Sequence, residues 1–202
     1  VVATFRNFGV IVRNRRYMLY VLQLAFAQGI LFAYIASSPF IVQQHYGFSP
    51  LAFSICFAVN AIAIGIAAAI SIKFRRPENG TLTGCIGMLL LSLLVMVALY
   101  NRCDFWTYEI LMFALLFMMG LTFTASTTLA MDSERQYAGA ASALLGALCF
   151  ASGGIVSPLV GLGNILVSTG VTFVVCAICS LLCALWAMRK VPMKVAMCRI
   201  FR

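Results

Sequence analysis

Residues 81–100 read TLTGCIGMLLLSLLVMVALY, a run of twenty residues without a charge. An α-helix rises 1.5 Å per residue, so a run of this length crosses the roughly 30 Å hydrocarbon core of a bilayer. The run lacks the alternation of apolar and polar residues that marks a strand, and a lipid-embedded helix satisfies its own backbone groups. We therefore predict a transmembrane helix over these residues.

Five further runs share this length and composition. The chain of 202 residues is 63% hydrophobic and 9% charged, which is typical of a protein embedded in a bilayer. We predict an all-α membrane protein in which residues 17–188 form six transmembrane helices: 17–38, 51–72, 81–100, 105–130, 138–159 and 165–188. Residues 1–16 are expected to form a basic linker or interfacial segment, and residues 189–202 a basic tail.

The basic residues separate the two sides of the membrane. Thirteen of the fourteen Lys and Arg residues fall before the first run, after the last, or in the connections 73–80 and 131–137. Only Arg102 falls in a connection on the other side. By the positive-inside rule both termini and the two segments that flank the bundle are cytoplasmic. A nucleic-acid partner is not expected despite the net charge of +9, because these charges follow the loops and are not interleaved with stacking aromatics.

Neither an enzyme nor a metal or cofactor site is expected. Cys176, Cys179 and Cys183 lie inside an apolar run without acidic or histidine neighbours, so they are interpreted as small apolar residues. No nucleophile has a base within plausible reach. The five acids all fall at the ends of runs or in connections, so a proton site, if there is one, is expected in another part of the protein.

Polar side chains concentrate on two of the six runs. At 100° per residue, one face of the first run and one face of the fourth combine aromatic and neutral hydrogen-bonding groups. Such a stripe suits a cavity for amphipathic molecules, and the same groups could instead bond neighbouring helices together. The candidate cavity residues, with Asn60 from the second run, are Gln23, Tyr34, Ser37, Ser38, Asn60, Phe117, Thr124 and Thr127.

The fifth run is unusually poor in bulky side chains. AGAASALLGALCFASGGIVSPLVG, residues 138–161, places small residues on two adjacent ridges, which permits close approach of another helix. A proline near the end of the run removes a backbone donor and permits a bend. The predicted packing and hinge residues are Gly139, Ser142, Gly146, Gly153, Gly154, Pro158 and Gly161. Gly80, Gly84 and Gly87 similarly predict close packing at the start of the third run.

Six runs with both ends on one side and short connections are typical of half a secondary transporter, built from two three-helix repeats of inverted topology. Three stretches carry a more specific resemblance: YIASSPFIVQQHYGFSP (34–50), FSICFAVNA (53–61) and AGAASALLG (138–146) followed by Pro158. The chain resembles the C-terminal half of a major facilitator superfamily transporter of the Bcr/CflA-type drug-efflux group. The first residue is Val, and we expect a further six-helix half upstream.

The resemblance also has departures. Gly153, Pro158 and Gly161 fit part of the antiporter motif that the family carries in its fifth helix, but Ser157 and Leu162 replace glycines of that motif. The connection KFRRPENG (73–80) lacks the signature of the family's first half. Both departures are expected of a second half, and the resemblance then implies that the membrane acid of related exporters lies in the first helix of the missing half.

The resemblance implies a multidrug exporter of a bacterial inner membrane, driven by the proton gradient as drug antiport with alternating access. Its expected partners are an amphipathic small-molecule substrate, the N-terminal six-helix half and the lipid bilayer. Two alternatives remain open on the sequence: a carrier of another small solute in the same superfamily, or a non-transporting six-helix protein that associates through residues 138–159.

Overall fold

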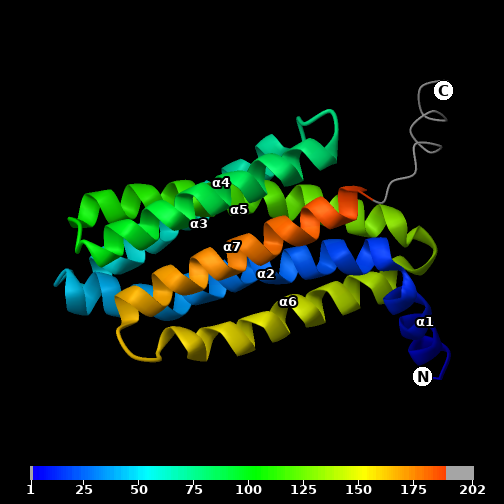
Figure 1. Cartoon of the computed structure of the whole chain (residues 1–202), viewed down its shortest axis with the longest axis horizontal. Coiled ribbons are helices and arrows are strands. Elements are labelled where there is room, and N and C mark those ends of the chain that lie inside the picture. The colour runs from blue at the N-terminus through cyan, green and yellow to red at the C-terminus, as the bar shows by residue number, and fades with distance from the viewer. Residues whose placement is uncertain (1, 190–202) are drawn as a thin grey trace.

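The computed structural model describes residues 2–189 and consists of helices (Figure 1). A short helix, α1 (Val2–Arg13), leads into six long ones: α2 (Arg15–Pro39), α3 (Pro50–Ser71), α4 (Pro77–Tyr100), α5 (Phe105–Ser133), α6 (Ala138–Val160) and α7 (Ile165–Arg189). Two short segments, η1 (Phe40–His45) and η2 (Arg135–Tyr137), extend α2 and precede α6. The six long helices are long and apolar enough to span a membrane, so the predicted fold class is confirmed. The expected tail after Arg189 lies outside the described residues.

Helix starts follow local capping chemistry. The side chain of Ser49 accepts the backbone N–H of Ala52, and Pro50 takes the first position of α3. Proline suits that position because its fixed φ is helical and its missing donor would have no partner there. Asp104 caps α5 in the same way by accepting the N–H of Thr107. These two caps fix where the chain enters α3 and α5.

Two helix ends differ most from the predicted spans. α4 begins at Pro77, four residues before the predicted start at 81, because a proline in the first turn favours helix and the apolar pattern does not register it. The first span was predicted to end at 38, yet the helical segment continues as the π-helix η1 to His45. Pro39 cannot donate to the preceding turn, and the chain continues with wider hydrogen bonds such as Tyr46 N–H to the carbonyl of Ile41, 3.1 Å.

The most extensive helix contacts join one of α2, α3 and α4 with one of α5, α6 and α7. α2 packs on α5, α6 and α7; α3 packs on α5; and α4 packs on α5 and α7. If α2 is exchanged with α5, α3 with α6 and α4 with α7, these six packed pairs map onto one another. For example, the pair α2–α6 becomes the pair α5–α3. Two three-helix units related in this way are what an inverted repeat requires. The sequence alone carries no clear internal repeat, so the packing supplies this relation.

Glycines set the closest helix crossings. A Cβ added at Gly84 of α4 would lie 2.8 Å from the carbonyl oxygen of Met118 on α5, and one added at Gly120 of α5 would lie 2.7 Å from the carbonyl oxygen of Ile64 on α3. Helices in lipid associate through such small-residue contacts. The predicted close packing at Gly84 is therefore confirmed, and these two crossings hold α5 against its neighbours on both sides.

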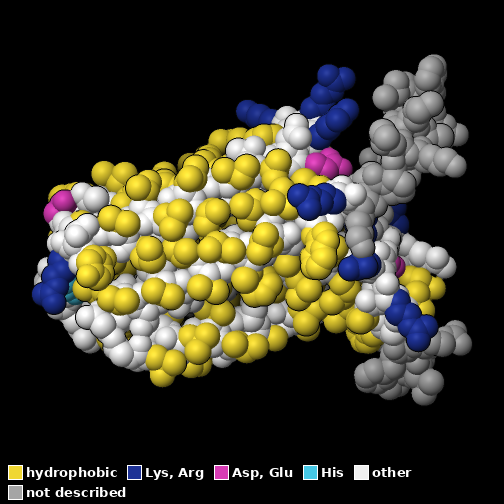
Figure 2. All heavy atoms as spheres, in the orientation of Figure 1, with side chains coloured by type: hydrophobic (Ala, Val, Ile, Leu, Met, Phe, Trp, Pro, Cys, Tyr) yellow, Lys and Arg dark blue, Asp and Glu magenta, His cyan; other side chains and the backbone are white. Residues whose placement is uncertain are grey.

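The surface divides into an apolar belt and two polar ends. In Figure 2 the middle of the bundle is covered by apolar side chains, and Lys and Arg side chains gather mainly at the end where α1 lies. At the opposite end lie the connections between α2 and α3, α4 and α5, and α6 and α7; we call it the Arg102 end, after its one described Lys or Arg residue. An apolar belt between polar ends is the surface expected of a protein that spans a bilayer.

Candidate substrate cavity

A polar cluster links three helices inside the apolar bundle. Asn60 lies near the middle of α3 and is fully buried. Its amide nitrogen donates to the hydroxyl oxygen of Tyr34 on α2 at 3.1 Å and to a carboxylate oxygen of Glu109 on α5 at 2.9 Å. The ring of Tyr34 stacks on Phe57, with centroids 5.7 Å apart. Aromatic faces and hydrogen-bonding groups from three helices therefore meet at one place.

Glu109 corrects the expectation that every acid is peripheral. It lies in the second turn of α5, as the sequence shows, but its half-buried carboxylate reaches the middle of α3 through Asn60. An ionisable group that bonds inside a membrane bundle is costly unless it is paired, and such groups usually serve transport. The signal was present in the sequence: two steps of four back from Phe117, a predicted cavity residue, give Phe113 and then Glu109 on the same helix face.

Several polar atoms around this cluster have unused bonding capacity. Among the described residues, no hydrogen-bond partner is present for the side-chain oxygen of Asn60 or for the hydroxyls of Ser38 and Tyr108. Each of these side chains is almost fully buried. Buried polar atoms normally find a partner in protein or water, so the cluster can bind a proton, water or a polar group of a substrate.

The other predicted residues of α2 face the interior of the bundle. Gln23 is fully buried and donates to the hydroxyl of Ser180 on α7 at 3.0 Å, which is the interhelical arrangement that the sequence left as an alternative. Ser37 donates to the carbonyl of Tyr34 in its own helix at 3.5 Å. Of the predicted α2 residues, the cluster therefore directly includes Tyr34.

The three predicted residues of α5 share one face of the helix. Phe117, Thr124 and Thr127 are half-buried, on the same helix face that begins at Glu109. Thr128, which follows Thr127, is exposed, and its hydroxyl donates back to the carbonyl of Thr124 at 2.9 Å. Gly120 belongs instead to the tight crossing with α3 described above. Phe117 and Thr124 therefore extend the face of Glu109 away from the Arg102 end.

Helix α6 directs most of its small residues away from the bundle. A Cβ added at Gly139, Gly146 or Gly154 would have no neighbour within 4 Å, and Ser142 is exposed. Gly153 alone of the predicted set meets a neighbouring helix closely, since an added Cβ there would overlap the ring of Phe32 on α2. Pro158 lies in the last turn, and Gly161 caps the helix by donating to the carbonyl of Pro158 at 3.1 Å.

Comparison with known proteins identifies the family. Residues 2–158 match the family model described as Major Facilitator Superfamily. The chain is 35% identical over 164 residues to an uncharacterized MFS-type transporter, YdgK, of Bacillus subtilis strain 168. The match covers 79% of this chain and 40% of that relative, so the chain spans less than half the length of the relative it matches. With its six membrane-spanning helices in two paired units, the chain belongs to the Major Facilitator Superfamily of transporters.

Proposed function

We propose that this chain is the six-helix C-terminal half of a multidrug exporter of the Bcr/CflA type. The sequence stretches 34–50, 53–61 and 138–146 support this group within the superfamily. The half would act with a second six-helix unit in a bacterial inner membrane, with both termini cytoplasmic, and would rock against that unit to expose the cluster of Tyr34, Asn60 and Glu109 to each side in turn. The proton gradient would drive export.

The observation that carries this proposal is the bond from Asn60 to both Tyr34 and Glu109. Aromatic rings accept apolar substrates of varied shape, while a few fixed polar groups orient them. Glu109 adds a group whose charge changes when a proton binds. Loss of that charge weakens the bond from the Asn60 amide, so proton binding at Glu109 would be coupled to the hydrogen bond that joins α3 to α5.

Ethidium export by the full-length transporter that contains residues 1–202 tests this proposal. It is expressed in cells that lack their own drug pumps, and dye accumulation is measured with and without a protonophore. Glu109→Gln removes a charge-assisted hydrogen bond and is expected to slow export about tenfold. Asn60→Ala is expected to slow it similarly because it unlinks all three groups.

Glu78→Gln is the matched control, since Glu78 is an acid at the opposite end of the bundle from the Arg102 end, and it should export at the wild-type rate. Export that is unaffected by Glu109→Gln would remove the proposed role of the cluster. If the wild-type protein exports no dye but accumulates or releases another labelled solute, the carrier alternative replaces drug export.

The outward ridge of α6 favours a second candidate, a six-helix protein that associates with a partner through this helix. Gly146 and Gly154 have open space beyond them, which leaves room for another helix. Gly146→Leu together with Gly154→Leu should then abolish the association and leave membrane insertion intact. An unchanged oligomeric state on crosslinking in membranes would dismiss this candidate.

A further inference from the structure

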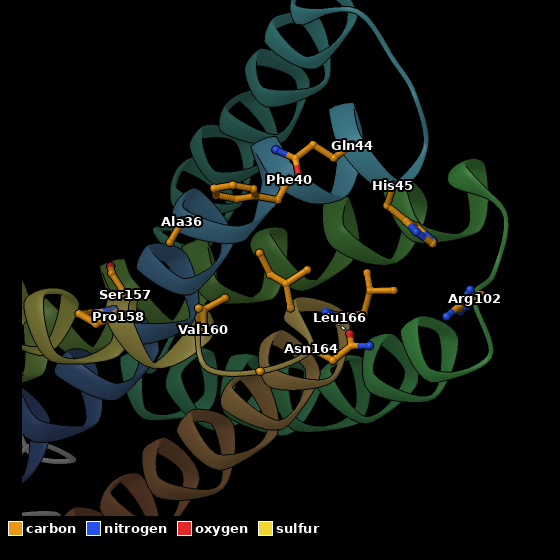
Figure 3. A pocket seen from close by; sticks show the side chains of 13 residues that line it. Ala36, Phe40, Gln44, His45, Arg102, Ser157, Pro158, Val160, Asn164 and Leu166 are labelled. Carbon is orange, nitrogen blue, oxygen red and sulfur yellow. Dashed lines mark hydrogen bonds between the residues drawn. The ribbon is translucent and has the colours of Figure 1, made fainter.

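A cavity lies at the Arg102 end, separate from the Tyr34, Asn60 and Glu109 cluster. It has a volume of about 790 Å³ and lies between the ends of α2 and α6, η1, the α4–α5 connection and the start of α7 (Figure 3). No residue of the polar cluster lines it. A cavity of this volume falls in the range that accepts small organic molecules.

One charged residue, Arg102, lines this cavity. It comes from the α4–α5 connection and lies on the same side of the cavity as His45, the last residue of η1, in Figure 3, and no Asp or Glu belongs to the described lining. The described residues place no acid within ion-pair distance of Arg102. The nearest acid in the chain is Asp104, whose two carboxylate oxygens accept the N–H and the hydroxyl of Thr107. That acid is engaged in capping α5, which leaves the guanidinium available to a ligand.

Two amide side chains also line the cavity. Asn164 accepts the backbone N–H of Leu166 through its side-chain oxygen at 3.0 Å, as the dashed line in Figure 3 marks. Its amide nitrogen is thereby left as a donor in the lining, and Gln44 contributes a second amide. Arginine and amide donors together suit a carboxylate or a phosphate.

The lining also includes apolar side chains. Phe40, Pro158 and Leu166 line the cavity, and Phe40 is 46% exposed although it is large and hydrophobic. A ligand that fits both the charged and the apolar parts of the lining has a charged head and an apolar body. A small inorganic anion would leave the apolar side chains uncovered.

We propose that this cavity binds an organic anion, with its carboxylate or phosphate on Arg102 and its apolar part against Phe40, Pro158 and Leu166. The ligand is either a free amphipathic anion or the headgroup region of an anionic lipid, which share this chemistry. The site goes beyond the proposed export function and does not depend on it.

Dansylglycine, which joins a carboxylate to a naphthalene ring, serves as the probe, and its methyl ester as the neutral match. The full-length transporter is placed in phosphatidylcholine nanodiscs, and the rise in dansyl fluorescence is titrated against protein, with empty nanodiscs subtracted. We expect the acid to bind at least about tenfold more tightly than the ester, because the ester cannot form the charge-assisted bond.

Arg102→Gly tests the head contact. Arg102 has φ 47°, a left-handed conformation that glycine adopts without strain, so this variant removes the guanidinium and leaves the turn intact. It should weaken binding of the acid about tenfold and leave the ester unchanged. Arg102→Lys should restore part of the loss. Arg75→Gly, which removes an exposed cation from the connection at the opposite end, should change neither ligand.

Ser157→Phe tests the volume, since Ser157 lines the cavity and is half-buried, and it should weaken both ligands. Equal binding of the acid by wild type and Arg102→Gly would overturn the proposal, as would an equal loss in Arg75→Gly. Adding phosphatidylglycerol to the nanodiscs separates the sources. If phosphatidylglycerol displaces the probe from the wild type but not from Arg102→Gly, the ligand is an anionic lipid. If it does not displace the probe, while Arg102→Gly still weakens binding of the acid, the ligand is a free anion.

Discussion

Gly84 shows how a single hydrogen atom in place of a side chain sets a helix crossing. A Cβ at this position would lie 2.8 Å from the Met118 carbonyl oxygen and 3.0 Å from the Thr122 Cβ, and a backbone carbonyl cannot move aside cheaply. We expect Gly84→Ala to lower the free energy of unfolding by about 1–3 kcal/mol, the usual cost of overpacking. Thermal unfolding of the purified protein in detergent, followed by circular dichroism, measures the effect.

Gly146→Ala is the matched control, because it makes the same change in a helix where an added Cβ meets nothing within 4 Å. It should be neutral or raise the free energy of unfolding by up to about 1 kcal/mol, since alanine favours helix more than glycine does. If Gly146→Ala destabilised the protein as much as Gly84→Ala, helix crossing would not explain the cost.

The candidate site was only partly predictable from single residues. Tyr34 and Asn60 stand out in the sequence because polar groups are rare in apolar runs, and the structure joins them. Glu109 was predicted to be peripheral because it lies only four residues after Phe105, the first residue of α5, and a sequence shows position along the chain only. It does not report how far a four-bond side chain reaches across to a neighbouring helix, nor that Asn60 lies within its reach. Gln23 has the same polar character and turns instead to Ser180.

At the scale of one element, the start of α5 depends on the charge of its cap. The N–H and hydroxyl of Thr107 donate to Asp104 and lower the pKa of its carboxyl below the ordinary value. Because the pKa of this carboxyl is lower in the folded state, its ionised form stabilises the fold at pH values above its unfolded-state pKa of about 3.9. This stabilisation is lost as the pH falls through the folded-state pKa. We expect amide exchange in the first turn of α5, corrected for intrinsic rates, to accelerate as the pH falls below about 4.

Asp104→Asn separates charge from capping. Asparagine caps helices about as well as aspartate but has no titrating carboxyl. Exchange in the first turn of this variant should show no acceleration between pH 5 and 3 beyond the intrinsic rate, values chosen to bracket the pKa of about 3.9. An acceleration equal to that of the wild type would show that another group governs this helix end.

Helix existence was predictable and helix ends were less so. Long uncharged runs can only be helices in lipid, so all six were found from composition. The ends depend on particular residues: Pro77 starts α4 early, and Pro39 converts the last turns of the first span to a π-helix. Apolar periodicity carries no information about a missing backbone donor, so the extension to His45 was not predicted.

At the scale of the whole molecule, the relation between two halves of the bundle appears in packing and not in sequence. Exchanging α2–α4 with α5–α7 preserves the six most extensive helix pairings, although the residues at corresponding positions differ. Packing in lipid needs small residues at crossings and apolar residues elsewhere, and many sequences satisfy that requirement. A repeat of structure therefore survives where a repeat of sequence does not.

The charge distribution fixes how this bundle should sit in a bilayer. The α1 end has most of the cations and the Arg102 end has one described Lys or Arg, so from the positive-inside rule we expect the α1 end in the cytoplasm. In a cysteine-free background of the full-length transporter, a membrane-impermeant maleimide added to intact cells should label Asn101→Cys and leave Arg75→Cys unlabelled. Inverted membrane vesicles should reverse the pattern, and permeabilised cells should label both, which shows that each thiol is reactive. Labelling of Arg75→Cys in intact cells would mean that loop cations do not orient this protein, and the opening of the Arg102 cavity would then face the cytoplasm.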